Sequence, residues 1–201
     1  MTATRRALLA LGLLAAWGGM PACSERRPAD CCPCAAASQA ALDEPLMSLL
    51  AAARAYHHQA DLHLAREEPE QAVAALRELL ALPLAAKWAE AEEVRLDAAA
   101  RLAKLLLAAG AIEKALELVD GQLSAPARQS FYLANLHAVR GEALEARSKR
   151  LDASGEQGEA REVARRAIEA FERSIAINKQ LQRALDNAGK KPSAPKEEGT
   201  R

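Results

Sequence analysis

The chain has 201 residues with 27 basic and 27 acidic side chains, and only six residues are aromatic. A nucleic-acid-binding protein needs an excess of basic residues, so this balance of charge argues against that class. The length fits a single domain. Alanine and leucine, which have the highest helix propensities, dominate, whereas the β-branched and aromatic residues that favour sheets are few. The composition therefore predicts an all-α protein.

Residues 1–22 have the composition of an export signal. Arg5 and Arg6 precede the uncharged, apolar stretch 7–20. This stretch has the length of a signal-peptide core and is short for a membrane span of about 20 residues. Glycines and a proline then interrupt any helix before Cys23. We expect export and removal of residues 1–22, with a retained N-terminal anchor as the alternative.

The sequence of residues 20–23, Met-Pro-Ala-Cys, resembles the end of a bacterial lipoprotein signal, although its proline is atypical. The resemblance implies that Cys23 becomes the lipidated first residue of the mature protein. Because Ser24 follows, it also implies a place in the cell envelope, on the outer membrane and facing the periplasm. Cleavage by an ordinary signal peptidase stays open, and so does the export route, since residues 4–10 also resemble a twin-arginine signal.

The other three cysteines, Cys31, Cys32 and Cys34, lie in a segment that we interpret as a flexible tether over residues 23–44. Cys31 and Cys34 have the spacing of a thioredoxin-type redox motif. Such a motif needs a strand before it, but the residues that precede these cysteines are polar. Three thiolates can bind a soft metal, yet a tetrahedral zinc site needs a fourth ligand and none is nearby in the sequence. We expect disulfides in an oxidising compartment and no cofactor. A metal-binding or thiol-redox role, with the helices as carrier, remains the alternative.

From Pro45 onward, prolines and glycines separate segments with helical periodicity, as expected because proline breaks a helix interior but is tolerated in its first turn. Short connections favour antiparallel neighbours, so we predict three antiparallel helical hairpins in a domain over residues 45–188. The tail, residues 189–201, is polar and predicted to be disordered. The six predicted helices cover residues 45–66, 69–82, 86–109, 112–123, 126–152 and 157–187.

The second helices of the three hairpins share a pattern, seen in residues 70–83, 113–126 and 165–178. Each has a small residue, followed four positions later by a larger apolar one, and each first helix also has a small residue. The small residues are Ala72, Ala115 and Ala167 in the second helices and Ala60, Ala103 and Gly141 in the first; the apolar residues are Leu76, Val119 and Phe171.

This pattern resembles the tetratricopeptide repeat (TPR), a two-helix unit of about 34 residues in which the small residues lie where its helices cross. The resemblance implies a short right-handed solenoid over residues 45–178. The spacings from Ala72 to Ala115 and from Ala115 to Ala167, 43 and 52 residues, are longer than the family's, so the repeat is degenerate. An unrelated up-down helical bundle is the alternative.

Gly141 is the most specific of these positions, because a glycine inside a helix costs about 1 kcal/mol relative to alanine. We expect close packing near Ala167 to be the reason for it. On that interpretation Gly141→Ala gains helix propensity, whereas Gly141→Leu overpacks the crossing.

The TPR resemblance implies a concave groove formed by the first helix of each hairpin, and a non-enzymatic protein–protein interaction module that scaffolds or assists assembly of a cell-envelope complex. The expected partner is a protein or peptide of the envelope, with the membrane reached through the lipid anchor. No catalytic motif contradicts this expectation; an accessory domain of an enzyme is a further possibility. By family position, the groove residues are Arg54, His57, Asp61, Asp97, Lys104, Asn135, Glu142 and Glu145.

Overall fold

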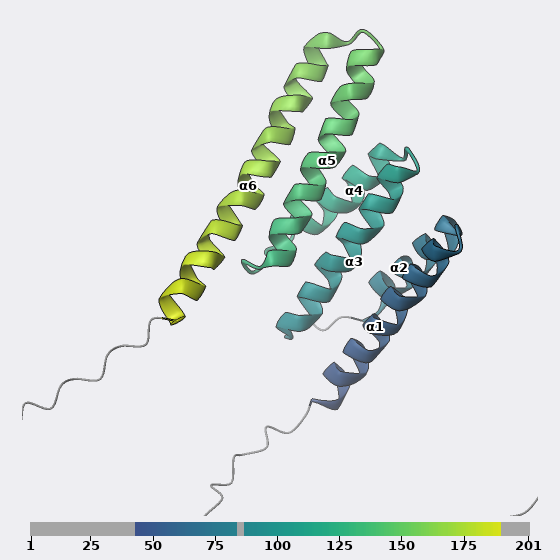
Figure 1. The fold of residues 1–201 in the computed structure, drawn as a ribbon, viewed down its shortest axis with the longest axis vertical. Helices are drawn as coiled ribbons and strands as arrows, with labels where there is room; N and C mark the ends of the chain where they lie inside the picture. Colours follow the sequence, from purple (N-terminus) through teal and green to yellow (C-terminus); the bar gives the residue numbers. More distant parts are fainter. Residues whose placement is uncertain (1–42, 84–86, 190–201) are drawn as a thin grey trace, which may run out of the picture. The chain divides into compact units, whose positions relative to one another are not determined.

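The computed structural model describes residues 43–83 and 87–189. The predicted signal, all four cysteines of the predicted tether and the tail after Gly189 lie outside these residues. The described residues are helical, with no strand among them, which confirms the predicted all-α class (Figure 1). The helices are α1 (Glu44–Ala65), α2 (Pro69–Ala81), α3 (Ala89–Ala108), α4 (Ile112–Leu123), α5 (Phe131–Ala153) and α6 (Gln157–Gly189).

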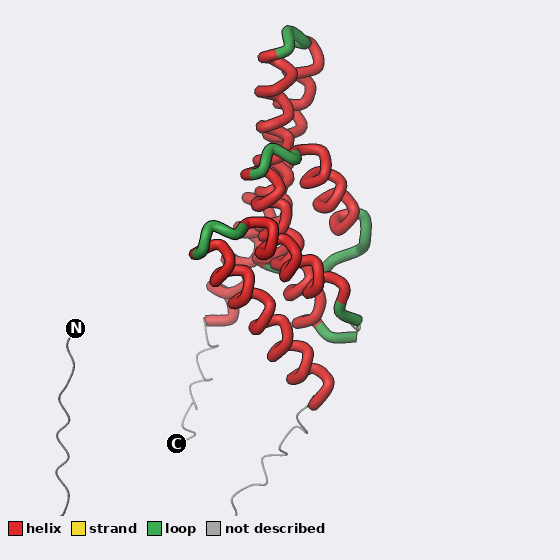
Figure 2. Tube along the Cα trace, turned by 90° about the vertical axis from the view of Figure 1, so that its right-hand side faces the viewer, coloured by secondary structure: helices red, strands yellow, loops and turns green. Residues whose placement is uncertain are grey.

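The helices pack as three successive hairpins, α1 with α2, α3 with α4, and α5 with α6. Neighbouring hairpins meet through α1 and α3, α2 and α3, α3 and α5, and α4 and α5. Within the described residues, the backbone of the first hairpin does not come close to that of the third. The first helices α1, α3 and α5 follow one another, because α1 contacts α3 and α3 contacts α5. Figure 2 shows the loops that join the helices.

Local signals explain most of the helix boundaries. The Asp43 side chain caps α1 by accepting from the Leu46 amide at 3.4 Å, and Pro69 occupies the first turn of α2, where its missing amide proton costs nothing. The prediction that the fifth helix begins at residue 126 is wrong, because α5 begins at Phe131. Ser130 is its N-cap and accepts from the Leu133 amide at 3.1 Å, as serine does at helix starts.

The core consists mainly of alanine and leucine, so the helices pack at close range. The small residues predicted to lie at helix crossings are buried. Ala60, Ala72, Ala103 and Ala115 are fully buried and belong to one cluster that joins the first two hairpins to α5. Ala167 belongs to a second cluster, between α4, α5 and α6.

Gly141 lies in α5 directly against the ring of Phe171 in α6. A Cβ atom added at Gly141 would be 2.7 Å from both Cε1 and Cζ of that ring. The half-buried Phe171 therefore occupies the space that a side chain at position 141 would need. The close approach was expected, but the ring of Phe171, rather than Ala167, is its nearest neighbour.

None of the described helices combines the length and the apolar character that crossing a bilayer requires.

Candidate interaction groove

The eight predicted groove residues lie on the three first helices, as expected. Arg54, His57 and Asp61 are on α1, Asp97 and Lys104 on α3, and Asn135, Glu142 and Glu145 on α5. His57, Asp97 and Asn135 are half-buried, and the other five are exposed.

The structure brings some of these side chains together across helices. His57 Nε2 lies 3.5 Å from Asp97 Oδ2, which links α1 to α3. Lys104 Nζ lies 3.9 Å from Glu142 Oε1, which links α3 to α5. Glu145, in contrast, pairs with Lys149 of its own helix at 2.6 Å. The polar faces of α1, α3 and α5 are thus connected by side-chain pairs from one helix to the next.

Arg101 of α3, which the sequence analysis missed, is central to the link between α1 and α3. It donates to His57 Nδ1 at 2.8 Å and also forms an ion pair with Asp61. Since the guanidinium only donates, Nδ1 of His57 accepts and the ring proton lies on Nε2, toward Asp97. Its partners lie on another helix, 44 and 40 residues earlier in the chain, so no helical spacing in the sequence indicated it.

The pKa of His57 is lowered from its ordinary value of 6.5. Burial is the main cause and the charge of Arg101 adds to it, while Asp97 and Asp61 act in the opposite direction. The pKa of His137 on α5 is lowered as well, by burial and then by the charges of Arg173 and Arg140. Both imidazoles are therefore neutral at pH 7.

This gives a pH dependence of stability with a definite sign. A histidine whose pKa is lower in the folded state binds fewer protons there, so its stabilising effect is complete above about pH 6.5 and declines as the pH falls. We expect the free energy of unfolding to fall less between pH 7 and 5 in His57→Gln than in the wild type. Urea unfolding at several pH values measures this. The exposed His58 provides the control as His58→Gln, and equal pH slopes for the His57 variant and the wild type would contradict the assignment.

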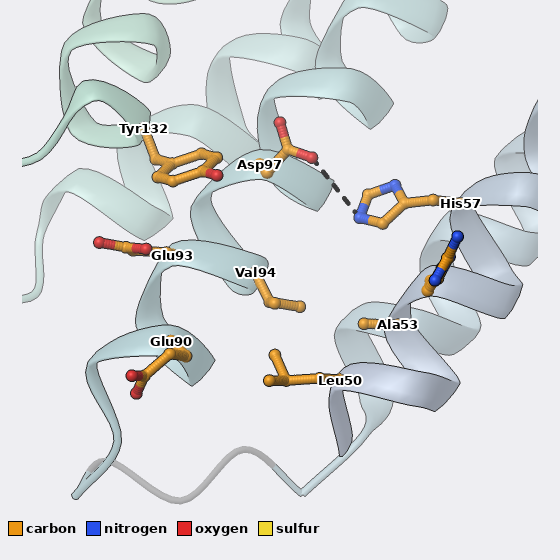
Figure 3. Close-up of a pocket in the computed structure, with 9 residues that line it drawn as sticks. Leu50, Ala53, His57, Glu90, Glu93, Val94, Asp97 and Tyr132 are labelled. Atoms are coloured by element: carbon orange, nitrogen blue, oxygen red, sulfur yellow. Dashed lines mark ion pairs between the residues drawn. The ribbon is translucent and has the colours of Figure 1, made fainter. Parts of the chain in front are cut away.

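A pocket of about 300 Å³ opens between α1 and α3 (Figure 3). Its apolar side chains are Leu50, Ala53 and Val94, and Tyr132 reaches it from the start of α5. The remaining lining residues are charged or polar: Arg54, His57, Glu90, Glu93 and Asp97. Three of the predicted groove residues thus line a defined hollow.

Glu90, Glu93 and Tyr132 were not among the predicted groove residues. Glu90, Glu93 and Asp97 occupy one face of α3, at spacings of three and four residues, and this pattern was visible in the sequence. Within residues 43–83 and 87–189, the side chains of Glu90 and Glu93 form no hydrogen bond or ion pair.

Among residues 43–83 and 87–189, no group of three or more histidine, cysteine, aspartate or glutamate side chains is arranged to hold a metal ion. Cys31, Cys32 and Cys34, the candidates named from the sequence, lie outside these residues.

No protein-family model matches the chain, and neither a curated protein nor a solved structure shows significant similarity to it.

Proposed function

We propose that residues 43–189 form a TPR-like interaction module that binds an extended polypeptide along α1, α3 and α5. The observation that carries this proposal is the pocket between α1 and α3, to which all three first helices contribute a side chain. Pockets of this kind, with apolar walls and a few polar groups, are where ligands usually bind. The Lys104–Glu142 pair continues the same polar surface onto α5.

Two features of the packing support the TPR-like assignment. The small residues at equivalent positions, Ala60 and Ala103 in first helices and Ala72 and Ala115 in second helices, are fully buried. In addition, within the described residues the backbone of each hairpin comes close only to that of its neighbour in sequence, as in repeat proteins. The spacing from Ala115 to Ala167 is longer than that of the family because it runs through α5 into α6, which are long helices of 23 and 33 residues.

The place of action that we propose is the cell envelope. It is supported by the signal-like residues 1–22 and the lipoprotein-like sequence that ends at Cys23. A lipid anchor at Cys23 would hold the helical module near a membrane, where it scaffolds or assists the assembly of an envelope complex.

Site-specific photo-cross-linking with the full chain tests both parts. A photoreactive residue replaces Arg54 or Glu142 on the proposed groove, or the exposed Glu117 or Glu172 on α4 and α6 as controls. We expect a discrete cross-linked protein from the groove positions and not from the controls. The cross-linked product should begin at an acylated Cys23, and Cys23→Ser should abolish acylation.

Equal cross-linking from all four positions, or none from the groove, would argue against the groove. A mature N-terminus at another residue would argue against the lipid anchor and leave the groove unaffected.

A further inference from the structure

We propose that the pocket between α1 and α3 receives a lysine or arginine side chain of the partner polypeptide. This inference rests on the proposed function and deepens it, because it names the chemistry of the residue that is bound. The pocket, as defined above, combines an apolar surface, an excess of carboxylates and one aromatic ring.

The charges that line the pocket favour a cation. Three carboxylates, those of Glu90, Glu93 and Asp97, line the pocket together with one guanidinium, that of Arg54. Asp97 lies against His57, whose lowered pKa keeps the imidazole neutral at pH 7. Within the described residues no ion pair neutralises Glu90 or Glu93, so negative charge is in excess and a cation is attracted.

The apolar part of the pocket explains why a long basic side chain fits better than a small cation. Leu50, Ala53 and Val94 lie together in the pocket, with Asp97 above them and the carboxylates of Glu90 and Glu93 to one side (Figure 3). Lysine and arginine bury their methylene stems on apolar surface while the charged end stays near polar groups. A pocket of about 300 Å³ is at the small end of the range for ligand sites, which suits one side chain of an extended partner.

Tyr132 adds a third element. Its side chain is 40% exposed and lies at the carboxylate side of the pocket, next to Glu93 in Figure 3. An aromatic face attracts a lysine or arginine cation within about 6 Å. The ring and the carboxylates therefore favour the same kind of ligand.

Among the residues that line the pocket, Arg54 carries the positive charge that opposes this ligand. Arg101 also contacts His57, but it forms an ion pair with Asp61. Arg54 also lines an adjoining hollow on α1 with His58 and Asp61. Its positive charge lowers the affinity of the pocket for another cation. Substitutions at Arg54 and at the glutamates must therefore change binding in opposite directions, which makes the proposal easy to test.

The test is a titration of the full chain with three decapeptides in a glycine–serine background, followed through the NMR methyl signals of Leu50 and Val94. The peptides differ only in two adjacent central residues, which are lysines, uncharged norleucines or glutamates. We expect saturable shifts with the lysine peptide only. Glu90→Gln with Glu93→Gln should weaken its binding about three- to tenfold, as expected for the loss of two charge interactions near the protein surface. Arg54→Gln should strengthen it.

The matched control is Glu117→Gln with Glu172→Gln, which changes the net charge equally but on exposed positions of α4 and α6. It should leave the affinity unchanged. Equal binding of the lysine and norleucine peptides, equal weakening by the control, or no shift of the pocket signals would each overturn the proposal. If cross-linking from Arg54 and Glu142 still captures a partner, the proposed function stands while this inference fails; without such cross-linking, both fail.

Discussion

Leu136→Ala is expected to lower the free energy of unfolding by about 2–5 kcal/mol, the usual cost of a cavity left by a core leucine. Leu136 of α5 is fully buried, in the cluster that joins the third hairpin to the first two. Urea unfolding monitored by circular dichroism measures the loss. Leu185→Ala is the matched control, because Leu185 of α6 is 57% exposed and exposed substitutions usually change stability by about 0.5 kcal/mol or less. Equal losses in the two variants would contradict the described core.

The Leu136→Ala variant also tests how far a loss of stability in one hairpin spreads to the others. In a linear stack, stability is shared between nearest neighbours. Since the backbones of α1 and α2 do not come close to those of α5 and α6 within the described residues, amide exchange should accelerate more in α5 than in α1 in the Leu136→Ala variant. Uniform acceleration across all described helices would instead indicate one fully cooperative unit.

Much of the fold could be predicted because helix periodicity and its interruptions are local properties of the sequence. Pro69 fixed the start of α2, and Gly110, with a φ of 73°, stands at the turn between α3 and α4, where glycine is favoured because it lacks Cβ. The start of α5 was missed because proline at residue 126 was given more weight than Ser130. Ser130 caps the helix: its side-chain oxygen accepts a hydrogen bond from a free backbone amide of the first turn, whereas proline has no side-chain oxygen to do so.

The candidate site could be predicted only in part, because its contacts join residues from different helices. His57, Asp97 and Arg54 were named from the repeat register and line the pocket. Arg101 was missed because its partners, His57 and Asp61, lie about 40 residues earlier in the chain, a relation that helical spacing cannot reveal. Tyr132 was missed for the same reason: it comes from α5 but lines a pocket otherwise formed by α1 and α3.

Gly141 shows how the structure changes a prediction made from helix propensity. Propensity alone favours Gly141→Ala by about 1 kcal/mol. In the structure, however, the new Cβ would lie 2.7 Å from two atoms of the Phe171 ring, a distance that forces the ring to move. Because the ring packs against the second core cluster, moving it also loses contacts with α5 and α6 residues.

We therefore expect Gly141→Leu to destabilise the protein by about 1–3 kcal/mol, as overpacking does, and Gly141→Ala to destabilise it by a smaller amount. In a Phe171→Leu background, the flexible leucine makes room and Gly141→Ala should become stabilising, which gives a coupling energy within the range of about 0.5–3 kcal/mol for residues in contact. Thermal or urea unfolding of the four members of the double-mutant cycle measures it.

Gly121 of α4 supplies the control for helix propensity. A Cβ added there would meet nothing within 4 Å, so Gly121→Ala should stabilise the protein by about 0.5–1 kcal/mol. If Gly141→Ala stabilises as much as Gly121→Ala, and the coupling with Phe171 is near zero, the ring does not occupy the space beside Gly141. The small residue in α5 would then have no packing role, and the equivalence of Gly141 with the buried Ala60 and Ala103 would lose its physical basis. A clear coupling would instead mean that the small residue of the third hairpin permits a close crossing between α5 and α6.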